Sequence, residues 1–250
     1  MTVVDNGVKH AWSYGLYIQD EWKLLPSLVL NYGVRYDQFR AFDAGIEQKF
    51  DEKIGLGIDS FFKASPNLID EGQFGAPIIL TPFDYRTGRQ YGVELTATYD
   101  AGSFSSYLNA AYERAAGRDI VSSQFQFSPD ELSYIAGHFI PLDHQQIVTI
   151  SAGASYKWQG LTFSGDLLFG SGPRRDGATP NGDHIPAYTQ VNLGVSRGFR
   201  LGGADGFTAR FDVINLFDEK YEIRDGTGVG VGAPQFGPRR GFFVGLSKAL

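Results

Sequence analysis

Apolar and polar residues alternate with a period of two along nearly the whole chain, and this feature most limits the folds available to it. In the segment 91–100, one set of positions is apolar and the other is polar or glycine. The apolar set is Tyr91, Val93, Leu95, Ala97 and Tyr99, and the other is Gly92, Glu94, Thr96, Thr98 and Asp100. Successive side chains point to opposite faces of a strand, whereas a helix would scatter both sets around its axis.

The same alternation predicts about eleven strands, each longer than the usual soluble strand of about 5–6 residues. Their ranges are 13–24, 27–40, 43–51, 53–64, 87–101, 103–116, 145–158, 160–171, 186–199, 206–220 and 239–250. Residues 2–11 are a weak candidate for a twelfth. We expect one short helix at 128–137, with Ser128 as N-cap and Glu131 completing a capping box.

The connections between these strands alternate in length. Short ones lie at 25–27, 51–52, 101–102, 159–160 and 201–205, and long ones at 65–86, 117–144, 172–185 and 221–238. Short turns at one rim and long loops at the other are typical of outer-membrane barrels. The junction at 40–43 is an exception, because it has almost no loop where a long one is expected.

Composition agrees with a barrel and excludes several other classes. The chain has 32 Gly, 20 Phe and 13 Tyr, no stretch of about 18 apolar residues, and no Cys. A net charge of -6 argues against a nucleic-acid partner. Met1 and the residues after it lack the basic start and apolar core of a secretory signal, so we expect no signal peptide in the chain as given.

Several segments resemble the barrel of TonB-dependent outer-membrane receptors. They are Tyr14-Gly-Leu-Tyr-Ile-Gln-Asp-Glu-Trp-Lys23, Leu28-Val-Leu-Asn-Tyr-Gly-Val-Arg-Tyr-Asp37, Arg89-Gln-Tyr-Gly-Val-Glu-Leu95, Val213-Ile-Asn-Leu-Phe-Asp-Glu-Lys-Tyr221 and Pro238-Arg-Arg-Gly-Phe-Phe-Val-Gly-Leu246. The resemblance implies uptake of an external ligand such as a siderophore, a place in the bacterial outer membrane, and contact with its lipid, its lipopolysaccharide and the barrel assembly machinery.

The chain also departs from that family. Family members resemble a plug inside a 22-stranded barrel, whereas this sequence shows neither plug nor TonB box, so contact with TonB is not expected. An internal deletion near residues 40–44 would explain the missing loop there, and Leu250 stands where such barrels tend to end in Phe. The chain is thus expected to be one barrel domain over 1–250, all-β, antiparallel and transmembrane, with about 10–12 strands.

No catalytic site, metal site or cofactor is predicted. His10, His138, His144 and His184 show no metal-binding spacing, and the glycines at 226–232 lack the strand and helix of a nucleotide loop. Ser171, Asp183 and His184 suggest a hydrolase only weakly, since no GxSxG motif is present. An outer-membrane hydrolase therefore remains a minor alternative to a non-enzyme.

Charged residues on the polar face are the main site candidates, because a charge facing lipid near the membrane midplane costs roughly 2–4 kcal/mol. The predicted lumen-facing charges are Arg35, Asp37, Asp59, Glu94, Glu113, Asp166, Arg210 and Asp212. Candidate ligand contacts in the long loops are His138, His144, Arg174, Arg175 and His184. The arginine pairs 174–175 and 239–240 are either rim charges or an anion-binding mouth. Two functions stay open, a ligand receptor barrel and a passive pore or structural mini-barrel, natural or shortened from such a receptor.

Overall fold

The computed structural model describes residues 15–36, 40–74 and 79–249. Its main element is one antiparallel sheet in which each long strand pairs with the next along the chain. The long strands are β1 (Leu16–Leu25), β2 (Leu28–Tyr36), β3 (Arg40–Phe50), β4 (Ile54–Asp70), β7 (Phe83–Asp100), β8 (Phe104–Ile120), β10 (Val148–Trp158), β11 (Leu161–Gly170), β14 (Tyr188–Leu201), β15 (Ala204–Ile214) and β18 (Gly241–Lys248). All eleven predicted strands are confirmed. Residues 2–11 lie outside the described part.

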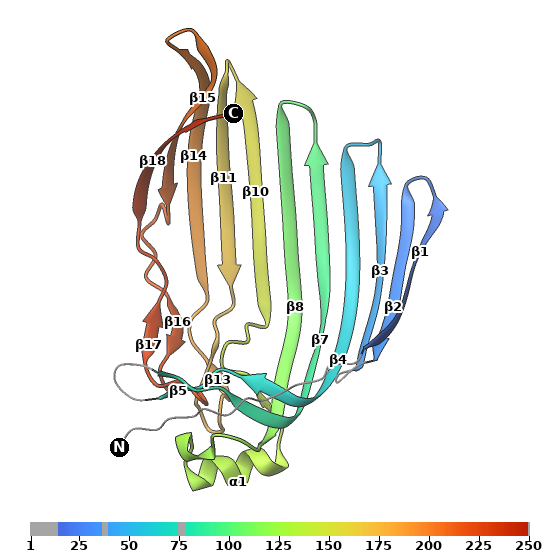
Figure 1. Cartoon of the computed structure of the whole chain (residues 1–250), viewed down its shortest axis with the longest axis vertical. Coiled ribbons are helices and arrows are strands. Elements are labelled where there is room, and N and C mark those ends of the chain that lie inside the picture. The colour runs from blue at the N-terminus through green and yellow to red at the C-terminus, as the bar shows by residue number, and fades with distance from the viewer. Residues whose placement is uncertain (1–14, 37–39, 75–78, 250) are drawn as a thin grey trace, which may run out of the picture.

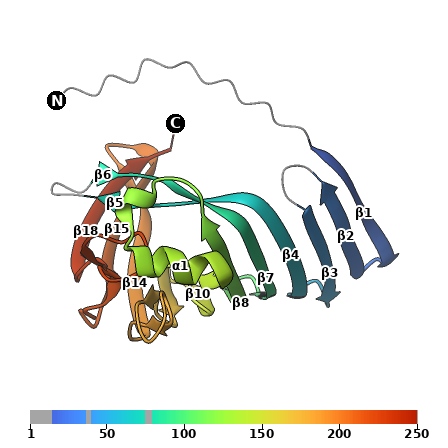
Figure 2. The same ribbon diagram turned by 90° about the horizontal axis from the view of Figure 1, so that it is seen from below.

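The sheet curves into a trough, with β1 and β18 as its end strands (Figures 1 and 2). Its convex face carries the apolar half of the alternation. Leu95 on β7 lies opposite Ala110 on β8 and opposite Ile58 on β4, and these three side chains point to the same face. Leu95 is 48% exposed and Ile58 44%, so this apolar surface has no protein covering within the described residues. Such a band requires lipid, as the sequence predicted.

Short turns connect the strands at one rim, at the top of Figure 1. Two of them have two residues, Gln159-Gly160 and Gly202-Gly203, and in both turns the two φ angles are positive, from 48° to 82°. Positive φ at both positions is the type I′ geometry that matches the twist of a hairpin. The predicted short connections are therefore confirmed.

The other rim carries the long connections, at the bottom of Figure 1. They contain the hairpins β5–β6 (Gln73–Phe74 and Ile79–Leu80), β12–β13 (Arg174–Arg175 and Asp183–His184) and β16–β17 (Glu222–Asp225 and Pro234–Phe236), together with the 3-10 turn η1 (Gln124–Gln126), the helix α1 (Pro129–Gly137) and β9 (Ile140–Pro141). The glycines at 226–232 fall in the β16–β17 loop, so the nucleotide-loop reading is excluded. No helix in the described ranges is long and apolar enough to cross a membrane.

Helix α1 forms with the predicted cap. The Ser128 side chain accepts a hydrogen bond from the Glu131 N–H, and the Glu131 carboxylate accepts one from the Ser128 N–H. Asp130 and Glu131 lie in the first turn, where their carboxylates interact favourably with the positive end of the helix dipole.

Several strand boundaries differ from the sequence prediction, among them the ends of β4 and β15. β4 runs on to Asp70 because pairing with β7 continues in the same register on both sides of Asn67, whose φ is 54°, from Pro66 and Thr87 to Leu68 and Tyr85. The predicted loop 65–86 is accordingly only 71–82. β15 stops at Ile214, not 220, because Asn215 turns the chain at φ 51° and its amide bonds the backbone of Glu219. Tyr36 of β2 pairs with Arg40 of β3, so the junction is short, as predicted, but it falls at 37–39, outside the described residues, and not at 40–43.

One connection crosses the open side of the trough. The β5–β6 hairpin follows β4 and lies on the side of the trough that carries β15 and β18 (Figure 2). There the Gln73 N–H donates to the Gly230 carbonyl at 2.7 Å. We call the described residues of this connection, 71–74 and 79–82, the strap.

An introduced arginine should affect the free energy of unfolding differently on the two faces of the sheet. Leu95→Arg should lower the free energy of unfolding in lipid vesicles by about 2–4 kcal/mol and reduce the heat-modifiable band in SDS-PAGE, because it places a guanidinium toward lipid. The neighbouring Thr96→Arg, on the concave face, should fold as wild type. Equal stability of the two variants in urea titrations would contradict this assignment of the faces.

Candidate functional site

The long-loop rim has a hydrophobic core of its own, separate from the sheet. Its side chains come from the start of β7, the second half of β8, the residue after η1, α1, β9 and the loop that follows it, and the loop after β16. They are Phe83, Tyr85, Ala115, Ile120, Phe127, Ile135, Ile140, Leu142 and Val229. Burying each large side chain contributes about 1.5–3 kcal/mol, so these connections form a packed layer. We call it the loop layer.

Asn181 joins three connections within the loop layer. This fully buried residue donates from Nδ2 to the Pro141 carbonyl at 2.8 Å, and its Oδ1 accepts from the Val229 N–H at 2.8 Å. Its own N–H donates to Asp176 at 2.9 Å. The bonds link the β9, β12–β13 and β16–β17 segments, which are far apart in sequence.

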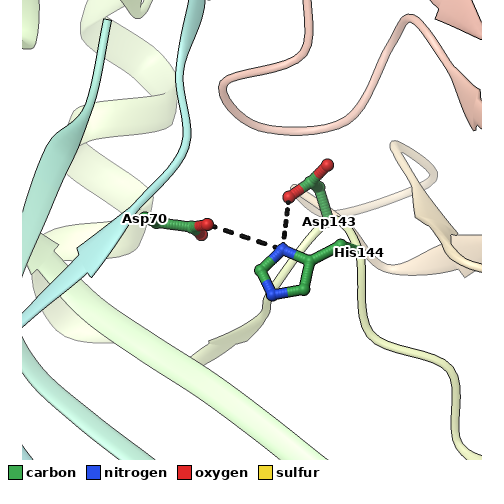
Figure 3. Close-up of side chains that lie close together, drawn as sticks. All are labelled: Asp70, Asp143 and His144. Carbon is green, nitrogen blue, oxygen red and sulfur yellow. Dashed lines mark hydrogen bonds and ion pairs between the residues drawn. The ribbon is translucent and has the colours of Figure 1, made fainter. Parts of the chain in front are cut away.

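A second group is formed by the buried Asp70 and Asp143 and by His144, whose side chain is 53% exposed, and we call it the carboxylate–histidine cluster. Asp70 comes from the end of β4, and the other two from the loop after β9 (Figure 3). His144 Nδ1 lies 3.0 Å from Asp143 Oδ1 and 3.5 Å from Asp70 Oδ1. The two carboxylate side chains are only 1% and 2% exposed. The hydrogen bond to Asp143 raises the pKa of His144.

Arg224 from β16 completes the surroundings of this cluster. Its Nε lies 3.2 Å from Asp143 Oδ2, and its Nη2 lies 3.1 Å from Glu71 Oε2. The guanidinium is 11% exposed and therefore largely desolvated. One cation thus links the strap, the loop after β9 and the β16–β17 hairpin.

A polar network extends from the loop layer to the wall. The Asn192 amide donates to Asp166 at 2.6 Å and accepts from both Gln190 and the Asn215 N–H, and the Tyr221 hydroxyl donates to Gln190 at 2.8 Å. Tyr221 also stacks on Tyr188, with ring centroids 4.2 Å apart. Side chains of the wall and of the last long loop are therefore bonded directly to each other.

The concave face brings several of the predicted charges together. Asp59 lies directly opposite Glu94 in the register of β4 and β7. A recess of about 460 Å³ is lined by Asp59, Glu94, Glu113 and His144, among others. A second recess of about 680 Å³, nearer the short turns, is lined by Asp166 and Arg210.

The other predicted lumen-facing charges are located by an ion pair or by the register of neighbouring strands. Arg210 forms an ion pair of 2.7 Å with Asp212 on the same strand. Arg35 lies between Tyr17 and Ala41 in the register of β1, β2 and β3. Asp37 lies outside the described residues. A role of these charges in lining a hydrated lumen stays a prediction.

The loop candidates are dispersed. Arg175 pairs with Asp183 at 2.8 Å, and this contact lowers the pKa of Asp183. Arg174 donates from Nε to the Asn181 carbonyl, and His184 Nδ1 contacts the Ile185 carbonyl. His138 stacks on Tyr134 at 4.3 Å between ring centroids. Of the five, His144 alone belongs to the carboxylate–histidine cluster, and ligand contact by any of them stays a prediction.

The hydrolase candidates do not form a relay. The Ser171 hydroxyl accepts from the Val148 N–H at 3.0 Å, Asp183 binds Arg175, and His184 contacts a backbone carbonyl. Sequence reasoning, in turn, missed Asp70, Asp143, Asn181 and Arg224. The adjacent Asp143-His144 pair was the one local signal, and nothing nearby in sequence points to Asp70 or Arg224.

Asn181 allows a test of the loop layer. Asn181→Ala should destabilise the layer by about 1–3 kcal/mol, because two buried backbone groups lose their partners. Limited proteolysis and hydrogen exchange should show faster opening at 138–147 and 225–234, while the wall keeps its heat-modifiable band. Asn67→Ala is the matched control, since Asn67 has a similar φ of 54° but is exposed. Unchanged exchange in both variants would contradict the role given to Asn181.

Comparison with known proteins agrees with this architecture. Residues 40–216, more than half of the chain, match the family described as "TonB dependent receptor-like, beta-barrel", and residues 2–76 match the "Outer membrane beta barrel domain". A search of curated proteins found no match.

Solved structures of this kind are similar in fold. The unliganded ferric citrate transporter FecA has a TM-score of 0.66 at 19% identity, over 92% of this chain and 37% of its own. The FrpB iron transporter from Neisseria meningitidis (F3-3 variant) has a TM-score of 0.64 at 11% identity, over 93% and 38%. The ferric-catecholate import receptor Fiu from K12 E. coli has a TM-score of 0.62 at 14% identity, over 91% and 34%.

The chain spans just over a third of the length of these structures. The family match, the eleven-stranded antiparallel wall and its uncovered apolar face all lead to the same conclusion. The chain is an outer-membrane β-barrel protein and belongs to the TonB-dependent receptor-like β-barrel family.

Proposed function

We propose that this chain supplies barrel wall and outer loops of a receptor that takes up an iron chelate. The observation that carries the proposal is the loop layer, which has its own buried core above a charged concave face. A passive pore needs only a wall, whereas a packed layer at the mouth is suited to selecting a ligand. FecA and Fiu are described as handling ferric citrate and ferric catecholate, which are anionic chelates.

Arg175 is the contact that we propose for an anionic chelate. It lies on the short β12–β13 hairpin, its side chain is 42% exposed, and a bound anion can compete with Asp183 for its guanidinium. The alternative function, a passive pore or structural mini-barrel, assigns no ligand to this arginine.

Binding of ferric citrate and of a ferric catecholate can be followed by tryptophan fluorescence of the refolded chain in detergent. Arg175→Gln should weaken binding by about tenfold, because a charge-assisted hydrogen bond is lost. Arg200→Gln is the matched control, since Arg200 also pairs with an aspartate but lies at the short-turn rim. No saturable binding, together with steady ion current in planar bilayers, would favour the passive pore.

We also propose that the outer face binds lipopolysaccharide phosphates. Arg89, Arg114 and Arg118 form a triangle, because Arg89 lies opposite Ala116 and the other two flank that alanine on β8. Within the described ranges their side-chain partners are Phe139 and Tyr112, not carboxylates. They share the face of the apolar band and lie just beyond Tyr91 and Tyr112, at the level expected for lipid headgroups.

The double variant Arg89→Gln/Arg118→Gln should bind lipopolysaccharide at least about tenfold more weakly than wild type, because two charge-assisted contacts are lost. Phosphate analysis of the lipid that co-purifies with the chain measures this loss. Arg200→Gln again serves as control, since it removes one exposed arginine from the other rim. Equal phosphate content in all three proteins would refute the assignment.

A further inference from the structure

The carboxylate–histidine cluster has the spacing of a metal site. One ligand atom from each of Asp70, Asp143 and His144 can be chosen so that all lie within 4.8 Å of one another. Ligand atoms about 2.1 Å from a shared tetrahedral ion lie about 3.4 Å apart. The two distances from His144 Nδ1, 3.0 Å and 3.5 Å, are close to that separation.

Three buried polar atoms in or beside the cluster have no hydrogen-bond partner, and one of them, Asp143 Oδ2, is in ion-pair contact with Arg224. Asp70 Oδ2 has none, although the Asp70 side chain is only 2% exposed. The Tyr85 hydroxyl has none either, although Tyr85 is fully buried, and the charges that act on it are those of Asp70 and Asp143. Buried carboxylates and phenols are rarely left without a partner, because each costs about 1–3 kcal/mol. These atoms therefore leave hydrogen-bonding or coordination capacity for a ligand at this position.

The charges around the cluster are also unbalanced. Asp70 and Asp143 are buried carboxylates, Glu71 is 46% exposed, and Arg224 is the guanidinium that contacts this group within the described residues. When His144 is neutral, as metal binding requires, the two buried carboxylates and Arg224 leave one negative charge uncompensated, and Glu71 adds a second. A divalent cation would restore neutrality without protonating a buried side chain.

We propose that Asp70, Asp143 and His144 bind a divalent first-row transition-metal ion such as Zn²⁺, through carboxylate oxygens and the imidazole Nδ1. The mixed nitrogen and oxygen donor set favours such ions over Ca²⁺ and Mg²⁺, which prefer oxygen ligands alone. Binding requires the Nδ1 lone pair, so the neutral imidazole of His144 carries its proton on Nε2 when the ion is bound. Water fills the remaining coordination positions and can bond the Tyr85 hydroxyl.

This inference goes beyond the proposed function, because the ion is a resident structural ligand and not the transported chelate. It would connect the end of β4 to the loop after β9 and thereby add a cross-link to the loop layer. The sequence shows no metal motif because one ligand lies at position 70 and the others at 143–144.

Direct metal binding tests the proposal. The refolded full chain in detergent, stripped with EDTA, should bind one Zn²⁺ by calorimetry, and Co²⁺ should give a visible d–d absorption band. His144→Gln and Asp70→Asn should each weaken binding at least about tenfold and abolish the band. His184→Gln is the matched control, because His184 lies in the same loop layer and contacts only the Ile185 carbonyl among its side-chain partners.

Cu²⁺ electron paramagnetic resonance gives a readout on the wild-type chain that does not depend on the folding of a variant. The spectrum should show coupling to one imidazole nitrogen. Absence of that coupling, absence of stoichiometric Zn²⁺ binding, or an equal loss of binding in His184→Gln would each overturn the proposal. Because no iron chelate is used, these outcomes are independent of the ligand-binding test above.

Discussion

A backbone in hydrocarbon finds no water to bond its N–H and C=O groups, and the rest of this structure depends on that constraint. The strands meet it by pairing with their neighbours throughout the sheet, from β1 to β18. The same pairing fixes which face each side chain takes. A shift of one residue would turn Glu94 toward lipid and Leu95 inward, so the alternation specifies the register as well as the strand.

The wall and the loop layer are stabilised by different forces. The wall has few buried side chains, because its apolar face is reserved for lipid. The loop layer instead resembles a small soluble domain, with Phe83, Tyr85 and Ile135 fully buried and Asn181 and Asn215 fully satisfied by backbone partners. A side-chain change in one layer can therefore leave the other folded.

Features set by local sequence could be predicted, and features set by distant contacts could not. The eleven strands follow from alternation, and α1 follows from Ser128 and Glu131. The end of β15 was missed because Asn215 acts through its own left-handed backbone and through a bond to Pro238. The site was missed for a related reason. Asp70, Asp143 and Arg224 are separated by most of the chain, and no periodic pattern connects them.

The strap has a mechanical consequence for the mouth of the trough. The Gln73 N–H donates to the Gly230 carbonyl, and Glu71 forms an ion pair with Arg224. These two contacts attach the connection after β4 to the β16–β17 hairpin. The strap lies across the open side of the trough at this rim. Separation of the strap from the β16–β17 hairpin would therefore require both the Gln73–Gly230 hydrogen bond and the Glu71–Arg224 ion pair to break.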